Sequence, residues 1–107
     1  MKLLIAIINR EDSPGVLDAL AERQMPFTRL STTGGFLRTG NDTLLLGIEE
    51  ARVPEALDIL RRFCSIRKQF VDVGAAPFLG TLFQAPVEVT VGGATVFVVD
   101  VEGFHKI

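Results

Sequence analysis

Residues 2–24 read KLLIAIINREDSPGVLDALAERQ, and this stretch sets the pattern of the fold. Residues 2–8 are apolar at nearly every position, which predicts a strand that is buried on both faces of a sheet. Ser13 is a good helix N-cap, and Pro14 suits the first helical position because a missing N–H costs nothing there. The stretch therefore predicts a central strand followed by a helix that ends near Gln24.

The same unit returns forty positions later in the chain. The helical segment VLDAL at 16–20 is echoed by ALDIL at 56–60. Further strands are expected at 27–31 and 43–48, and a second helix from about 54 to 64. The order strand–helix–strand, strand–helix–strand predicts an α+β fold, a ferredoxin-like βαββαβ sandwich with both helices on one face of the sheet.

The C-terminal third carries a different pattern. Residues 87–91 alternate between valine and polar side chains, Gly92-Gly93 follows, and 94–101 is a second β-rich run. Two such runs around a Gly-Gly pair predict a hairpin, because a tight turn of the primed type needs positive φ at both central positions. We therefore expect an extra C-terminal β-hairpin beside the sandwich.

The composition indicates one folded domain without a membrane span. The 107 residues suffice for a single domain over 1–107, and 48% hydrophobic against 22% charged residues is typical of a globular chain. A mean hydropathy of +0.36 is high for a small monomer and favours an oligomer. The longest apolar run, 3–8, is far below the roughly 20 residues that cross a bilayer, and no signal-peptide cleavage site follows it. We expect a cytoplasmic protein.

Binding of nucleic-acid polymers and catalysis are both disfavoured. A net charge of −2 provides no basic field for a DNA or RNA backbone. Cys64 and His105 are the only residues of their types, so the chain has neither a disulfide framework nor a metal-ligand cluster. Carboxylates are scattered, and no nucleophile elbow or phosphate-binding P-loop occurs. We expect no enzyme activity, no metal and no resident cofactor.

Residues 32–42, TTGGFLRTGND, are predicted to form a glycine-rich loop. Gly34 and Gly35 allow the backbone to approach a ligand closely, and threonine hydroxyls beside backbone N–H groups suit a phosphate. Phe36 offers an apolar surface for a base, and the amide of Asn41 matches the edge of adenine. The plainer alternative is an ordinary hairpin loop with Phe36 in a core.

Residues 67–86 are expected to form a long apolar loop. Its large apolar side chains outnumber its charges after position 69: Phe70, Phe78, Leu79, Leu82 and Phe83, with Asp72 alone as a charge. Leaving such groups in water costs about 1.5–3 kcal/mol for each large side chain. The segment is therefore expected to pack onto a neighbouring subunit, a ligand or its own domain.

With the loop Thr-Thr-Gly-Gly-Phe-Leu-Arg at 32–38 and the run Val-Gly-Gly-Ala-Thr-Val-Phe-Val at 91–98, the chain resembles the PII-like cyclic-di-AMP receptors. These are small trimeric signal proteins of bacteria, and the likeness runs over the whole length. It implies a PII-like homotrimer with cyclic-di-AMP, or a related adenine nucleotide, in each cleft between subunits. It also implies signal transduction to a protein target, whose identity is unknown, without catalysis.

The resemblance further implies the residues of the site. A threonine holds phosphate, a glycine-rich segment and an asparagine surround an adenine, a second glycine leaves room for the base, and a phenylalanine adds apolar contact. The matching positions here are Thr28, Gly35, Phe36, Leu37, Asn41, Gly47 and Phe97.

The sequence departs from the family pattern at 25–28, where Pro26 stands in place of an arginine that contacts phosphate. Proline offers no donor, and losing such a contact costs about 1.5–3 kcal/mol of binding free energy. Arg29 and Arg38 are the candidates to compensate for this loss, although Arg29 is expected on the opposite face of its strand from Thr28. The long loop also keeps only Pro86 of the family's Tyr-x-Pro-Tyr-Pro type ending. Pro26 and the apolar run Phe78-Leu79-Gly80 favour an alternative function, a PII-like trimeric protein-interaction module with a decayed or altered nucleotide site, whose apolar loop binds a partner.

Overall fold

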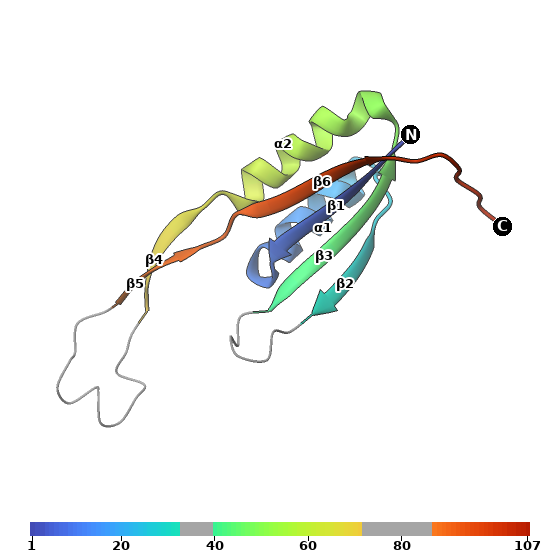
Figure 1. Ribbon diagram of the computed structural model, residues 1–107. Helices are drawn as coiled ribbons and strands as arrows, with labels where there is room; N and C mark the ends of the chain where they lie inside the picture. The colour runs from blue at the N-terminus through green and yellow to red at the C-terminus, as the bar shows by residue number, and fades with distance from the viewer. Residues whose placement is uncertain (33–39, 72–86) are drawn as a thin grey trace.

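The computed structural model describes residues 1–32, 40–71 and 87–107 (Figure 1). Its elements, in chain order, are β1 (Lys2–Asn9), α1 (Ser13–Glu22), β2 (Thr28–Thr32), β3 (Asn41–Ile48), α2 (Val53–Cys64), β4 (Arg67–Val71), β5 (Val87–Val91) and β6 (Ala94–Asp100). The 3-10 turns η1 (Arg10–Asp12) and η2 (Glu50–Arg52) lead into α1 and α2. None of the helices in these ranges is long and apolar enough to cross a bilayer.

Strand β1 lies inside a four-stranded antiparallel sheet of order β2-β3-β1-β6. The register places Ile5 between Leu45 of β3 and Phe97 of β6. The prediction of a central strand at 2–8 is confirmed, but the prediction that both of its faces are buried is wrong. Leu4, Ala6 and Ile8 are buried, whereas the alternate residues lie on a face that is only partly covered. The α+β class is confirmed too, and the strand order is compatible with the ferredoxin-like fold.

Helices α1 and α2 cover one face of this sheet. Every second residue of β1 and β3 is buried against them: Leu4, Ala6, Ile8, Leu44, Leu46 and Ile48. The helices contribute the apolar positions of their inner faces: Val16, Leu20, Ala56, Ile59, Leu60 and Cys64. Each large side chain buried in this way contributes about 1.5–3 kcal/mol to the free energy of unfolding. The core is built from a period of two residues in the strands and of 3.6 residues in the helices.

Helix α1 begins differently from the sequence prediction. Asp12 is its N-cap, and Ser13 is its first residue rather than the cap. The hydroxyl of Ser13 donates to the carboxylate of Asp42 instead, because a fully buried charge without hydrogen-bond donors is costly. The helix ends at Glu22, and Gln24 follows with a left-handed φ of 55°, close to the predicted end.

The predicted C-terminal hairpin is wrong in its pairing. Strand β5 pairs with β4, and β6 pairs with β1, so the two runs around Gly92-Gly93 belong to different sheets. Both glycines have the positive φ that was expected, 84° and 89°, yet they connect two sheets. The reason lies in β1, whose free edge offers the apolar β6 a seven-residue ladder from Ile8 to Lys2.

The predicted long loop at 67–86 needs the same correction. Its first part, Arg67–Val71, is strand β4, and the pairing of β4 with β5 forms a ribbon that we call the arm. The arm extends beyond the end of the main sheet (Figure 1). At its base, the N–H of Gly93 donates to the carbonyl of Cys64, and Arg67 pairs with Asp12 at 2.7 Å. Residues 72–86 lie outside the described part of the chain.

We expect the change Gly92→Ala to destabilise the fold by about 1–3 kcal/mol, because residues that carry a Cβ rarely adopt the φ of +84° found at Gly92. The added Cβ would also lie 2.7 Å from the carbonyl oxygen of Ser65. Gly47→Ala is the control, since a Cβ there meets nothing nearer than 3.9 Å. Urea denaturation measures both, and equal stability of Gly92→Ala and wild type would contradict the structural reason given.

Candidate functional site

The described residues of the predicted site all lie on the face of the main sheet that the helices leave uncovered, which we call the open face. Asn41 and Gly47 alternate with the buried residues of β3. Thr28 is paired with Leu45, and Phe97 with Ile5, so both share the face of those partners. Gly35, Phe36 and Leu37 lie outside the described residues, as does the 33–39 part of the predicted loop.

The four described site residues lie too far apart to form one cluster. Thr28 and Gly47 are diagonal neighbours on adjacent strands, a separation of about 7–8 Å. Asn41 lies six residues from Gly47 along β3, which corresponds to about 20 Å. Phe97 lies three strands from Thr28 in the same row, about 14 Å away. A single subunit therefore cannot bring all of them around one base.

The open face is strongly apolar. Its strands present large aliphatic or aromatic side chains to solvent: Leu3, Ile5, Ile7, Leu30, Leu45, Phe97 and Val99. Phe97 is 53% exposed, Leu30 48% and Val99 44%. Such a contiguous surface is typical of an interface between protein chains.

A hollow of about 330 Å³ lies at the Asn41 end of the open face, beside the base of the arm. Asn9, paired with Asn41 in the register, lines it together with Thr95 and the backbone of Gly92 and Gly93. The Asn9 oxygen accepts from the N–H of Glu11 at 3.0 Å, which leaves the amide N–H groups as donors. Amide and hydroxyl groups beside an apolar wall are the kind of surroundings that hold a purine edge.

Sequence reasoning did not select Asn9 or Thr95. The register could have indicated both, because Asn9 lies opposite Asn41 and Thr95 lies opposite Ile7 on the open face. Neither position is visible in the sequence until the strand order is known.

Phe104 is a second addition, at the other end of the open face. Its ring edge lies 3.9 Å from the position that a Cβ on Gly47 would occupy. The sulfur of Met1 lies 4.0 Å from the same position. The ring is 61% exposed, so much of its surface is available for contact. Phe104 follows the last strand outside any periodic pattern, and for that reason it could not be selected from the sequence.

Arg29 does not join this face. Its guanidinium lies 3.2 Å from the carboxylate of Asp42 on the helix-covered side, as the alternation of strand side chains predicts. It therefore provides no cation next to Thr28. Pro26, two residues before β2, is exposed and provides no cation either.

The sequence matches the family described as cyclic-di-AMP receptor over residues 1–107. The chain belongs to this family. The resemblance seen in its motifs is thereby confirmed. A crystal structure of a functionally unknown protein from Pediococcus pentosaceus ATCC 25745 is similar to this chain, with 40% sequence identity and a TM-score of 0.76. The match covers 99% of this chain and 96% of that one. A receptor family implies a binding role rather than a catalytic one.

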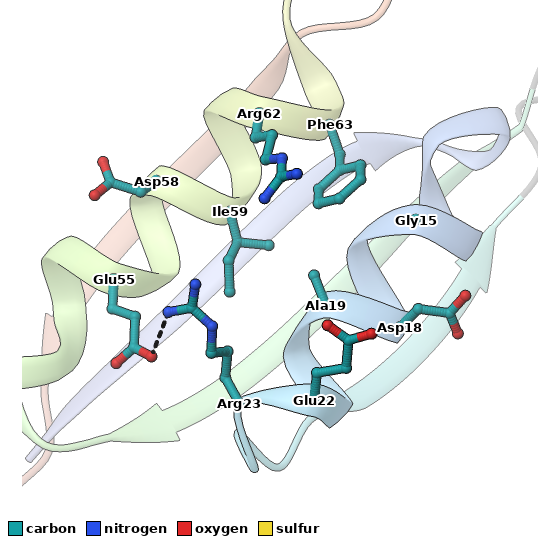
Figure 2. Close-up of a pocket in the computed structure, with 10 residues that line it drawn as sticks. All are labelled: Gly15, Asp18, Ala19, Glu22, Arg23, Glu55, Asp58, Ile59, Arg62 and Phe63. Atoms are coloured by element: carbon teal, nitrogen blue, oxygen red, sulfur yellow. Dashed lines mark hydrogen bonds and ion pairs between the residues drawn. The ribbon is translucent and has the colours of Figure 1, made fainter.

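The helix side of the molecule has a groove of a different kind. A volume of about 430 Å³ lies between α1 and α2, and Arg23 reaches across it to Glu55 at 3.0 Å (Figure 2). Asp18, Glu22 and Asp58 add further carboxylates to its walls. None of the described site residues lines this groove, and the open face therefore remains the candidate site.

The Cys64 thiol is unsuited to nucleophilic chemistry. Burial, followed by the charge of Asp12, raises the pKa of Cys64 to about 11 although Arg67 opposes the shift. The thiol is therefore protonated at neutral pH, and only the thiolate is an effective nucleophile.

We expect Cys64 in the folded receptor to react with iodoacetamide far more slowly at pH 8 than the same thiol in the urea-unfolded chain. A free cysteine has a pKa of about 8.5, whereas the thiolate of Cys64 forms only as the pH approaches 11, so the rate should rise with pH beyond 9. Mass spectrometry of quenched samples follows the reaction. Equal rates for folded and unfolded chains at pH 8 would contradict the assignment.

Proposed function

We propose that this receptor is a non-enzymatic signal-transduction protein that binds cyclic-di-AMP, or a related adenine nucleotide, in the clefts between the subunits of a homotrimer. The proposal includes a single PII-like domain over 1–107 and a site built from Thr28, Gly35, Phe36, Leu37, Asn41, Gly47 and Phe97. The observation that carries it is the arrangement of Thr28, Asn41, Gly47 and Phe97 on one uncovered face of the sheet, in a chain that belongs to a cyclic-di-AMP receptor family.

The separations on that face support a site shared between subunits. Asn41 is about 20 Å from Gly47, and Phe97 about 14 Å from Thr28, which is too far for one base to contact each pair. A neighbouring subunit that packs on the open face brings a second set of the same residues into the gap. A cyclic dinucleotide then contacts one set through each adenine and through its two phosphates.

The apolar character of the open face supports the assembly. Phe97, Leu30 and Val99 remain about half exposed in the single chain. Burying a large apolar side chain contributes up to about 1.5–3 kcal/mol, and several such residues per subunit give an assembly a substantial driving force. In a closed ring of identical subunits, each open face meets the next copy.

An alternative function is a PII-like trimeric protein-interaction module whose nucleotide site has decayed or altered. Pro26 favours it, since proline itself offers no donor at the position where the family pattern places an arginine. The arm and its base favour it as well, because Phe70 of β4 is 70% exposed and Ile66, which directly precedes β4, is 73% exposed. Apolar side chains presented in this way suit contact with another protein.

Titration calorimetry of the assembled protein with cyclic-di-AMP, cyclic-di-GMP, ATP and AMP tests the proposal. We expect heat with cyclic-di-AMP at protein concentrations of about 100 μM, a setting suited to micromolar dissociation constants. A bound ligand should also raise the melting temperature, because it stabilises only the folded state. Absence of both signals with every adenine nucleotide would refute nucleotide binding and leave the interaction module as the function.

We expect Pro26→Arg to tighten cyclic-di-AMP binding by about tenfold or more, since an arginine supplies a charge-assisted contact worth about 1.5–3 kcal/mol. Pro26 is exposed, so the change should leave stability nearly unaltered. Pro26→Ala is the matched control, because it removes the proline without adding a charge. Equal affinities of the arginine and alanine variants would show that this position does not face the phosphate.

A further inference from the structure

Asp42 is a buried carboxylate one residue from Asn41, on the opposite side of the sheet. Its side chain is 0% exposed and points toward the helices, whereas Asn41 belongs to the open face. The hydroxyl of Ser13 donates to it, the Nε of Arg10 lies 3.3 Å from Oδ1, and the Nε of Arg29 lies 3.2 Å from Oδ2. Groups from η1, α1 and β2 thus converge on Asp42, the second residue of β3.

These partners keep Asp42 ionised in a place that would otherwise neutralise it. Burial alone would raise the pKa of the Asp42 carboxyl, but the hydrogen bonds from Ser13, Ser31 and Arg10 and the charge of Arg29 together lower it below its ordinary value. A buried charge with several donors has a fixed geometry, because moving any partner leaves it unsatisfied. Asp42 is therefore a rigid anchor for Arg10.

Arg10, held in place by Asp42, contacts the backbone of Gly40 and of Asn41. Its backbone N–H donates to the carbonyl of Gly40 at 3.1 Å, and its Nη2 lies 3.5 Å from the carbonyl oxygen of Asn41. A Cβ on Gly40 would stand 2.5 Å from the guanidinium carbon. The planar group thus occupies the space directly over Gly40, where any side chain would displace it.

We propose that Arg10, fixed by Asp42, is the positioning residue that sets the direction in which Asn41 enters the nucleotide site. Arg10 holds the backbone of Gly40 and Asn41 from the helix side, and the amide of Asn41 points from that backbone into the hollow on the open face. Arg10 acts through Asn41 and does not contact the ligand. This inference rests on the proposed function, since it concerns an adenine-binding role of Asn41.

Arg10→Lys tests the inference because lysine keeps the charge but lacks the planar fork that joins a carboxylate to a neighbouring carbonyl. Arg52→Lys is a closely matched control. Arg52 has the same 37% side-chain exposure as Arg10, lies 3.2 Å from the carboxylate of Glu55, and donates to the carbonyl of Arg23 at 2.8 Å. It stands in η2, at the other end of β3 from Asn41.

We expect Arg10→Lys to weaken cyclic-di-AMP binding about tenfold in calorimetry, with Arg52→Lys binding like wild type. In the Asn41→Ala background, Arg10→Lys should cause no further loss, because a positioning residue has nothing left to position. A general structural role would produce the same loss in both backgrounds. Gly40→Ala, which displaces the guanidinium while keeping Arg10, should reproduce the tenfold loss and serves if Arg10→Lys does not fold.

Wild-type affinity of both Arg10→Lys and Gly40→Ala would overturn the inference while leaving the proposed function intact. A full additional loss in the Asn41→Ala background would overturn it as well. If the wild-type protein itself bound no adenine nucleotide, the proposed function would fail, and the inference with it.

Discussion

Pairing of β1 on both of its edges is the constraint on which the rest of this structure depends. Strand β1 is bonded to β3 along one side and to β6 along the other, so its own side chains must alternate between two faces. The even-numbered positions from Leu4 to Ile8 lie under α1 and α2 and contribute to the core. The odd-numbered positions form the open face, and they align Leu3, Ile5 and Ile7 with their partners on both neighbouring strands. One ladder register thus separates a packed face from a face available for assembly.

Local patterns predicted the elements of the sandwich, and non-local pairing decided the rest. The apolar run of β1 and the helical spacing in α2 depend on neighbours in sequence, so both were found close to their true bounds. Gly92 and Gly93 were expected to have positive φ, and they do, but which strands they connect depends on the free edge of β1, some ninety residues away. Ser13 failed as a predicted cap for the same reason, because the distant Asp42 takes its hydroxyl.

The candidate site shows the same division. Alternation along a strand places Asn41 and Gly47 on one face, and that much follows from their odd spacing relative to the buried leucines. Their separation from each other and from Phe97 depends on the strand order, which no local motif contains. Asn9, Thr95 and Phe104 enter the site only through the register and the path of the C-terminal tail. Residues 33–39, which hold the predicted adenine loop, lie outside the described chain.

The hydrogen bond at the base of the arm determines how far the length of the arm can change. Because the N–H of Gly93 meets the carbonyl of Cys64, the main sheet receives β6 from the same point whatever length of chain lies between. Each doubling of such an excursion adds only about 0.6 kcal/mol of closure entropy. Insertions and deletions between Ser65 and Gly92 are therefore expected to leave the ladder between β1 and β6 in register. The arm can change in length without changing the sheet that carries the open face.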